Sequence, residues 1–217
     1  MVPGPFAKFQ GYLMVDRSVH AKGVSIRLRR LVETNYGTFR GFVRLALGQI
    51  DFAVGRLDKH LHPQASQTER LVFVCLGNIN RSAFGEWVAR KHGATVCSIG
   101  LSTTTGAPAF PSAVKTATQF GIDLSSHAAT DLKDYEYRPG DLLLVMEIRH
   151  AKKLIAHGIP EAAIAFLGNW AAPHRIHLHD PHTLSDVYFQ TCFTLINSAV
   201  QNLVAELRSA ESPCVPR

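Results

Sequence analysis

Residues 72–82 read VFVCLGNINRS, a short apolar run that ends in a turn rich in Gly and Asn. The run Leu71–Cys75 contains mostly β-forming residues, so it predicts a buried strand. The residues from Arg81 to His92 predict a helix directly after the turn. A strand, a tight loop and a helix in this order are typical of a parallel α/β sheet, in which such loops bind ligands.

The loop between the strand and the helix has the composition of an anion-binding site. A helix N-terminus offers unpaired N–H groups and a partial positive charge, and a tight turn before it can point further N–H groups at one anion. Cys75 would present a nucleophilic sulfur there, Arg81 a planar fork for two phosphoryl oxygens, and Ser82 a donor to the leaving sulfur. A bare Cys-x5-Arg spacing more often marks a buried cysteine and an unrelated arginine, but the strand and helix around this one favour a phosphate-binding loop (P-loop).

Beyond the loop, runs of strand length alternate with segments of helical period. The predicted strands are Leu71–Cys75, Thr95–Ile99, Asp141–Met146 and Ile164–Leu167, and the predicted helices are Arg81–His92, Pro111–Phe120, Ile148–His157 and Thr183–Leu207. Strands separated by helices predict a parallel sheet covered on both faces. We therefore expect an α/β fold with a four-stranded parallel sheet flanked by helices.

Four motifs resemble those of the low-molecular-weight protein tyrosine phosphatase family. VFVCLGNINRS is similar to the family's valine-rich strand and C-x-G-N-x-C-R-S loop, and GAPAFPSAVKTATQFGIDLSSHAATDL, residues 106–132, to its G-x-P…G-I-D-L-S-x-H-x-A segment. DLLLVMEIRHAKKL, residues 141–154, and Asp180-Pro181 resemble two later motifs. The resemblance covers about residues 69–208. It implies a flavodoxin-like phosphatase fold and a hydrolase that removes phosphate from phosphotyrosine in proteins through a phosphocysteine, without cofactor or metal.

The resemblance also implies roles for individual residues. Cys75 would attack phosphorus, Arg81 would stabilise the transferring group, and Asp180 would protonate the leaving oxygen, with its backbone restricted by Pro181. Ser98 and His127, together with Asn78, match positions that hold the loop in shape. The residues that would cradle the phosphate are Leu76, Gly77, Asn78, Ile79, Asn80, Arg81 and Ser82. The alternatives are a helix-capping turn for Asp180 and an ordinary hydrogen-bonded histidine for His127.

The sequence departs from the family pattern close to the expected site. Asn80 stands where most members have a second cysteine, and His182 stands where an aromatic residue usually follows Asp-Pro. The segment STTT, residues 102–105, lacks the aromatic of the opposite wall. An Ile at the position of Ile79 resembles the tyrosine-directed members of the family, whereas the arginine phosphatases tend to carry Thr at this position.

Three alternatives to a tyrosine phosphatase therefore stay open. One is a phosphate-binding or scaffolding module without strong catalysis, and the others are an arsenate reductase and an arginine phosphatase of the same fold. A reductase needs a close pair of further cysteines, which Cys97, Cys192 and Cys214 do not form in the sequence.

The positive charge of the chain lies in its N-terminal third. Residues 1–66 hold ten Lys/Arg and four Asp/Glu, whereas residues 67–217 hold thirteen of each. This asymmetry predicts a basic, mainly helical extension with a linker over residues 1–66 and a phosphatase-like catalytic domain over residues 67–217. Within the extension we expect irregular chain over residues 1–22, helix from Val24 to Leu61 with a break near residues 35–37, and a linker over residues 62–67 in which Pro63 ends the helix.

Three interpretations of this extension stay open: a structural arm packed on the catalytic domain, an arm on an anionic membrane surface, or an arm bound to a partner helix. Nucleic acid is not expected as a partner, because the extension carries no recognisable binding motif. The sequence has no apolar window long enough to span a bilayer and no secretory signal. We therefore expect a bacterial enzyme of the cytoplasm, peripheral at the inner face of the membrane, with a phosphotyrosine-bearing protein such as a tyrosine kinase as its partner.

Overall fold

The computed structural model describes residues 17–61, 63 and 67–211, with side chains described from residue 26 onward. Its centre is a parallel sheet of four strands, which are β1 (Arg70–Cys75), β2 (Val96–Gly100), β3 (Asp141–Val145) and β4 (Ile164–Phe166). The strands lie in the order β2-β1-β3-β4. Cys75, the last residue of β1, pairs with Gly100 of β2, so the loop after β1 leaves from the carboxyl edge of the sheet.

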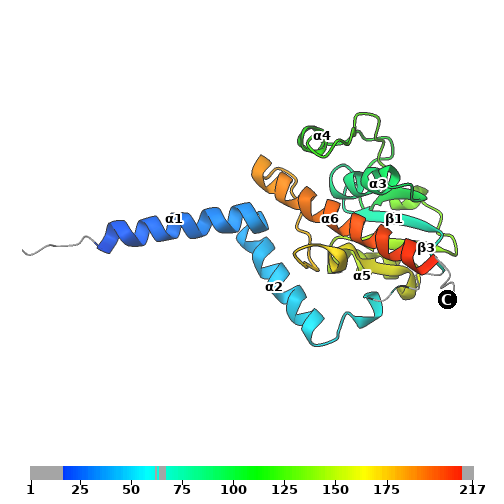
Figure 1. Ribbon diagram of the computed structural model, residues 1–217, viewed down its shortest axis with the longest axis horizontal. Coiled ribbons are helices and arrows are strands. Elements are labelled where there is room, and N and C mark those ends of the chain that lie inside the picture. The colour runs from blue at the N-terminus through cyan, green and yellow to red at the C-terminus, as the bar shows by residue number, and fades with distance from the viewer. Residues whose placement is uncertain (1–16, 62, 64–66, 212–217) are drawn as a thin grey trace, which may run out of the picture.

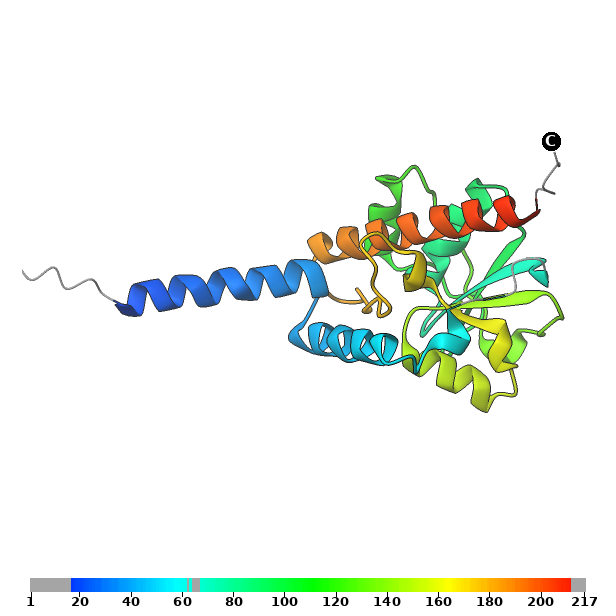
Figure 2. The same cartoon turned by 60° about the horizontal axis from the view of Figure 1, so that its bottom comes forward.

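Helices cover both faces of this sheet (Figures 1 and 2). One face carries α3 (Arg81–Lys91) and α6 (Asp186–Glu211), with α4 (Pro111–Thr118) packed against α6. The other face carries α5 (Ile148–Ala156) and the short 3-10 helix η1 (Asp58–His60). Further short 3-10 turns are η3 (Leu132–Asp134), η4 (Glu161–Ala163) and η5 (Leu167–Trp170).

The apolar residues of β1 contribute to two separate hydrophobic cores, one on each face of the sheet. Phe73 packs with Phe84 and Phe193 on the side of α3 and α6, whereas Val72 and Val74 pack with the side of α5. This follows because successive side chains of a strand point to opposite faces of the sheet. The fully buried strands therefore read as continuous apolar runs, and the predicted α/β fold with a four-stranded parallel sheet is confirmed.

The last helix was predicted with the wrong start. It begins at Asp186 instead of Thr183 and continues to Glu211. Thr183 has a φ of 60°, in the left-handed region, so it cannot belong to a right-handed helix. The three residues from Thr183 to Ser185 therefore remain part of the loop that carries Asp180.

The N-terminal extension forms two helices, α1 (Arg17–Tyr36) and α2 (Phe39–Ala53), which we call the arm. The expected break near residues 35–37 is confirmed, since α1 ends at Tyr36 and Thr38 caps α2 by accepting a 2.9 Å hydrogen bond from the Gly41 N–H. The prediction of irregular chain is wrong for residues 17–22, which are helical, and residues 1–16 lie outside the described part of the chain.

The end of the second helix was also predicted wrongly. Helix α2 stops at Ala53, well before Leu61, because Gly55 takes a φ of 72° that a helix cannot contain. Pro63 is therefore not the residue that ends it. Of the expected linker, residues 62 and 64–66 lie outside the described part of the chain.

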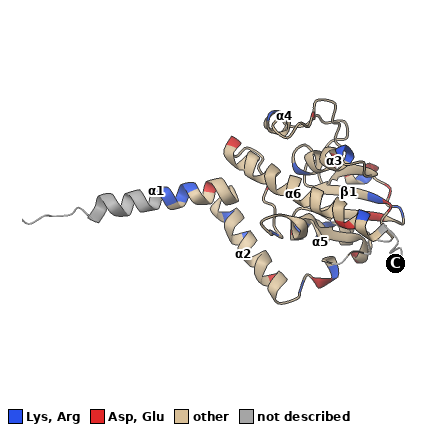
Figure 3. Cartoon of the chain, viewed as in Figure 1, with Lys and Arg blue, Asp and Glu red and all other residues tan. Residues whose placement is uncertain are grey.

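The two helices of the arm lie differently: α1 projects from the body, and α2 follows where α1 reaches it (Figures 1 and 2). Helix α1 projects away from the sheet and meets the rest of the chain near its C-terminal end, where it contacts α6 and α2. Figure 3 shows Lys and Arg positions on both helices of the arm, while residues of both charges are mixed over the body. Within the described residues, no helix has the length and apolarity needed to cross a bilayer.

Candidate functional site

The sulfur of Cys75 lies at the start of the loop that leads into α3. It accepts a hydrogen bond from the backbone N–H of Asn78 at 3.3 Å and lies 3.0 Å from the hydroxyl oxygen of Ser82. The first N–H groups of α3 follow directly and have no partner inside the helix, so the loop and the helix together form a positively polarised cradle. An anion bound in this cradle would face the Cys75 sulfur.

Asn78 holds the loop in shape through every polar atom of its side chain. Its amide nitrogen donates to the hydroxyls of Ser82 at 2.9 Å and Ser98 at 2.7 Å, and its amide oxygen accepts from the Thr130 N–H at 2.8 Å. His127 Nε2 lies 2.7 Å from the Asn78 carbonyl oxygen. Asn78 is fully buried and has a φ of 51°, a left-handed conformation that Asn adopts more readily than most residues. The structure thus brings Asn78, Ser98 and His127 together, as the resemblance implied.

Two members of this network were missed in the sequence. Thr130 enters through its backbone, which has no sequence signal. Glu86 accepts a 2.5 Å hydrogen bond from the Ser98 hydroxyl. Its spacing of four residues from Ser82 puts both on one face of α3, which is the signal that could have identified it.

Arg81 is fully buried and is held between two carboxylates. Its Nη1 donates to Glu147 Oε1 and to the Leu178 carbonyl oxygen, both at 2.8 Å, and its Nη2 lies 2.8 Å from Asp180 Oδ2. The Nε–H has no hydrogen-bond partner among the described residues. A bound phosphoryl group would supply the acceptor that this donor lacks.

Glu147 is the buried residue on which Arg81 depends, and sequence reasoning assigned it no role. It lies two residues after the apolar strand β3, at the carboxyl edge where ligand loops gather, and this position is the signal that could have found it. Arg149 Nε also lies 2.8 Å from Glu147 Oε2, and Arg44 Nη1 of the arm lies 3.6 Å from the same oxygen.

The charges in this cluster stabilise one another. Burial disfavours the charged form of Arg81, but the carboxylates of Asp180 and Glu147 outweigh it and raise the Arg81 pKa. Burial likewise opposes the charge of Glu147, but Arg81 and the hydrogen bond from Arg149 outweigh it and lower the Glu147 pKa. Both groups are therefore ionised at neutral pH.

Two histidines packed around Glu147 stay neutral. Burial is the main cause that lowers the pKa of His150 to about 3 and that of His177 to about 4, from an ordinary value of 6.5. Their Nε2 atoms each lie 3.7 Å from a Glu147 oxygen. An additional proton on either ring would be placed beside Arg81 in a buried site.

These histidines predict a loss of stability in mild acid. At pH values between the folded and the unfolded pKa, the unfolded chain binds protons that the folded chain does not. The contribution of the neutral histidines to the free energy of unfolding is therefore complete above about pH 6.5 and falls towards pH 4. At pH 5 we expect a loss of about 2 kcal/mol per histidine in the free energy of unfolding, measured by urea denaturation at pH 7 and pH 5. His150→Leu should reduce the difference between the two pH values, and an equal difference in both proteins would contradict the assignment.

Asp180 reaches the Cys75 pocket from the loop of residues 174–185, which we call the Asp180 loop. The pocket encloses about 190 Å³ and is lined by Cys75, Leu76, Gly77, Ile79, Asn80, Ser102, Asp180 and His182. Asp180 lies before α6 begins and accepts from the His182 N–H at 3.3 Å, so it is a loop residue and does not cap that helix. The geometry brings the Cys75 sulfur and the Asp180 carboxylate to one cavity, and Asp180 also pairs with the buried Arg81.

The pocket wall differs from a pair of aromatic rings. His182 meets Phe110 edge to face, with ring centroids 4.6 Å apart, and its Nδ1 lies 3.5 Å from the Asn80 amide nitrogen. Ser102, a small polar residue, also lines the pocket. A flat aromatic substrate would therefore meet the imidazole of His182 and a small polar side chain instead of two aromatic rings.

The inner face of α2 packs on the Asp180 loop. Thr38 Oγ1 lies 3.1 Å from His179 Nε2, and Gln49 Oε1 accepts from the Ile176 N–H at 3.4 Å. Phe52 packs against the His174 ring at 4.7 Å between centroids. The arm thus supports the loop along its length, up to the residue before Asp180.

Two glycines on this face predict opposite effects of the same substitution. A Cβ on Gly41 would lie 2.2 Å from the Tyr36 carbonyl oxygen and 2.8 Å from the His179 ring, whereas a Cβ on Gly48 would find its nearest neighbour at 3.8 Å. We expect Gly41→Ala to lower the free energy of unfolding by about 1–3 kcal/mol through overpacking. Gly48→Ala should raise it by up to about 1 kcal/mol through helix propensity. Thermal unfolding of both variants measures the difference, and equal shifts would contradict this packing.

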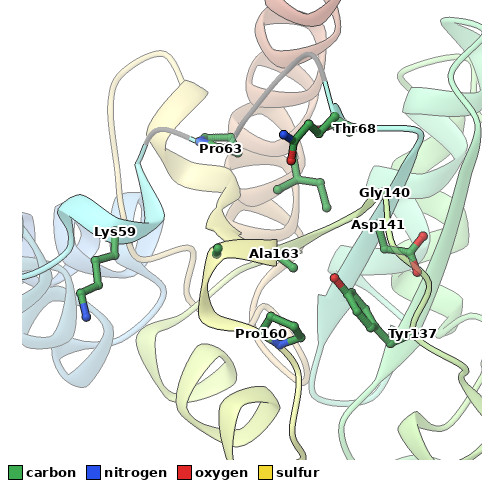
Figure 4. Close-up of a pocket in the computed structure, with 11 residues that line it drawn as sticks. Lys59, Pro63, Thr68, Tyr137, Gly140, Asp141, Pro160 and Ala163 are labelled. Carbon is green, nitrogen blue, oxygen red and sulfur yellow. The ribbon is translucent and has the colours of Figure 1, made fainter.

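A second cavity, of about 250 Å³, lies at the amino edge of the sheet (Figure 4). Its carboxylate, Asp141, already accepts from Arg70 Nε at 2.7 Å, from Arg70 Nη2 at 2.6 Å and from the Tyr135 hydroxyl at 2.6 Å. These bonds satisfy the carboxylate inside the fold, so the cavity offers no comparable reactive group. Among the described residues, no group of three or more His, Cys, Asp or Glu side chains is arranged to hold a metal ion.

The remaining cysteines stand apart from the pocket. Cys192 is buried and its thiol donates to the His179 carbonyl oxygen at 3.7 Å, whereas Cys97 is only half-buried on β2. Cys75, Cys97 and Cys192 are all free thiols. Cys214 lies outside the described part of the chain.

Comparison with protein families matches residues 70–212 to the low molecular weight phosphotyrosine protein phosphatases. The probable low molecular weight protein-tyrosine-phosphatase EpsP of Ralstonia solanacearum is 30% identical over 142 residues, which cover 64% of this chain and 96% of that protein. The low molecular weight protein-tyrosine-phosphatase Etp of Escherichia coli K12 is 31% identical over 141 residues, covering 63% and 93%. The family match begins after the arm.

Solved structures give the same result. The tyrosine phosphatase amsI of Erwinia amylovora superimposes with a TM-score of 0.58 at 25% identity, over 68% of this chain and 98% of that one. Wzb of Vibrio vulnificus, solved with benzylphosphonate, gives 0.54 at 29% identity, over 65% and 99%. The arginine phosphatase YwlE of Geobacillus stearothermophilus, at 19% identity, shares the fold.

Proposed function

Because the chain belongs to the low molecular weight phosphotyrosine protein phosphatase family, we propose that it removes phosphate from phosphotyrosine in proteins through a phosphocysteine on Cys75. The observation that carries this proposal is the pocket lined by both Cys75 and Asp180, with Arg81 paired to Asp180. A phosphate-binding module without catalysis would need the cradle, but it would have no use for a cysteine sulfur and a carboxylate in the same pocket.

In the first step the Cys75 sulfur attacks phosphorus, and the bond from phosphorus to the tyrosine oxygen breaks. Asp180 gives its proton to that leaving oxygen. Arg81 and the N–H groups of residues 76–82 stabilise the charge on the three remaining phosphoryl oxygens. The buried pair with Glu147 keeps the Arg81 side chain in place for this role.

In the second step Asp180 takes a proton from a water molecule that attacks phosphorus. The bond from phosphorus to sulfur breaks, and inorganic phosphate is released. The Ser82 hydroxyl, 3.0 Å from the sulfur, donates to Cys75 as it leaves. The hydrogen-bond network of Asn78 with Ser98 and His127 holds the Ser82 and Cys75 side chains in this geometry.

Two observations favour an aromatic phosphoester as the substrate. Wzb of Vibrio vulnificus, which this chain resembles, was solved with benzylphosphonate, a phosphonate carried on an aromatic ring. Ile79, an apolar residue, lines the pocket here beside His182. The physiological substrate that we propose is a phosphotyrosine-bearing protein, such as a tyrosine kinase.

The chain organisation belongs to the same proposal. We divide it into a basic extension, residues 1–66, and a catalytic domain, residues 67–217. We place the enzyme in the bacterial cytoplasm, where thiols such as Cys75 stay reduced. The extension would contact either the inner membrane surface, which would make the enzyme peripheral there, or a partner helix.

Hydrolysis of para-nitrophenyl phosphate without added metal tests the chemistry, and phosphotyrosine and phosphoserine peptides of one sequence test the substrate class. We expect turnover in the presence of a chelator and a preference for the phosphotyrosine peptide. A folded protein that binds phosphate but turns over neither substrate would favour the binding module. Preference for a phosphoarginine peptide would favour the arginine phosphatase.

The substitution Asp180→Asn tests the proposed acid. Asparagine keeps the shape of the side chain but cannot donate the proton, so we expect kcat for para-nitrophenyl phosphate to fall about a hundredfold. The loss should be smaller for an aryl phosphate whose leaving group is more acidic, because that oxygen needs less protonation. Asp186→Asn, an exposed carboxylate at the start of α6, is the control and should leave kcat unchanged. An equal loss for both leaving groups would argue that Asp180 acts only through Arg81.

A further inference from the structure

The arm exposes an unusual amount of apolar surface. Of the twelve large apolar side chains that are exposed among the described residues, nine lie in the arm and the turn that follows it. They are Ile26, Leu28, Leu31, Phe39, Phe42, Val43, Leu47, Ile50 and Val54. An exposed apolar patch of this kind on a folded chain is typical of an interaction surface.

On α2 these residues form a single face. Phe39, Phe42, Val43, Leu47 and Ile50 follow the spacing of one side of a helix, and Phe39 is 70% exposed. The opposite side, which holds Gly41 and Gly48, packs on the Asp180 loop. The helix therefore packs inward through Gly41, Gly48 and Phe52, and turns the apolar stripe from Phe39 to Ile50 outward.

Helix α1 continues this surface. Leu28 and Leu31 of α1 and Phe39 and Phe42 of α2 line an open hollow of about 1000 Å³ between the two helices. Beyond its contacts with α2 and α6, α1 projects from the body (Figure 1). A single projecting helix gains little from its own hydrogen bonds in water, so a surface that covers its apolar side would stabilise it.

Basic residues surround the apolar face. Arg27, Arg30 and Arg40 are exposed on the two helices, while Arg29 pairs with Glu33 (Figure 3). Residues 1–66 carry the entire formal charge of +6. A second copy of the chain would bring two such positive arms together, which is unfavourable, whereas an anionic surface complements them.

We propose that the arm lies on an anionic lipid bilayer. The apolar face of α2 and the apolar side chains that line the hollow beside it insert among the headgroups, and the arginines of the arm contact the lipid phosphates. Exposed apolar side chains flanked by Arg are the composition of helices that lie in the membrane interface. This assigns the partner that the proposed function leaves open between a membrane and a helix. Because it rests on the outer face of the arm, it does not depend on the phosphatase chemistry.

The test is sedimentation of the full chain with vesicles of phosphatidylcholine alone or mixed with an equal amount of phosphatidylglycerol. We expect binding to the mixed vesicles that weakens as salt is raised, and little binding to the neutral ones. Leu47→Gln with Ile50→Gln should weaken binding at least about tenfold, because both side chains are more than half exposed on the proposed contact face. Arg27→Gln, Arg30→Gln and Arg40→Gln together should weaken it about a hundredfold.

Matched controls use the same changes away from the arm. Ile155→Gln alters an apolar side chain of α5 that is 40% exposed, and Lys133→Gln, Arg138→Gln and Lys152→Gln together remove the same charge from the body. Both should bind as the unchanged chain does. Equal binding to neutral vesicles, equal loss in the controls, or a dimer in light scattering that Leu47→Gln and Ile50→Gln dissociate would each overturn the proposal. Para-nitrophenyl phosphate turnover is measured separately, so its absence would count against the proposed function alone.

Discussion

Cys75→Ser is expected to lower kcat for para-nitrophenyl phosphate by at least about ten thousandfold, to the background rate. A serine hydroxyl at neutral pH is a far weaker nucleophile than a cysteine sulfur. The substitution nearly preserves volume at a buried position, and the new oxygen can still meet the Asn78 N–H and the Ser82 hydroxyl. The fold and the phosphate cradle should therefore survive.

The control for this variant is Cys97→Ser, which changes the same atom on β2 outside the pocket. It should keep nearly all of the activity. Calorimetric titration with inorganic phosphate separates chemistry from binding, because Cys75→Ser should still bind the anion. Residual turnover of more than about one per cent in Cys75→Ser, or an equal loss in Cys97→Ser, would show that Cys75 does not carry the covalent step.

Glu147→Gln is expected to lower the free energy of unfolding by about 3–5 kcal/mol. The amide keeps the size of the side chain but removes the charge that faces Arg81, which is fully buried. Asp180 would then be the carboxylate left beside the guanidinium, and it lies on a loop. Breaking a buried pair in this way leaves an ion without full compensation, which costs much more than losing a pair in water.

The matched control is Glu161→Gln, which removes a partly exposed carboxylate from its pair with Lys59. Solvent screens this pair, so we expect a loss of less than about 1 kcal/mol. Urea denaturation at pH 7 compares the two variants. Glu147→Gln should also raise KM for para-nitrophenyl phosphate, because Arg81 loses the partner that orients it. Equal losses of stability in the two variants would mean that Arg81 does not depend on Glu147.

The sequence determined the sheet and the centre of the site because both are encoded locally. A buried strand requires consecutive apolar residues, and a phosphate cradle requires a tight loop before a helix, so Val72 to Ser82 predicts both. The late Asp-Pro pair could be placed only through the resemblance to a family. The structure brings Asp180 to the Cys75 pocket across about a hundred residues of chain.

Contacts between distant residues were decided by the tertiary structure. Glu147 reads as one more charged residue after a strand, and only the packing of β3 beside β1 places it against Arg81. Thr130 joins the loop network through a backbone N–H, a group that every residue except proline has.

The orientation of α2 is the clearest case of this division. The spacing of its apolar residues determines that the helix has an apolar face, but this spacing does not determine whether the face packs on the protein or points away from it. The glycines decide this, because Gly41 and Gly48 both face the Asp180 loop and let the backbone approach it closely. At Gly41 a larger side chain would not fit at this distance. The helix therefore packs closely through its glycines and leaves the stripe from Phe39 to Ile50 exposed. This outcome is set by shape complementarity in space and not by composition along the chain.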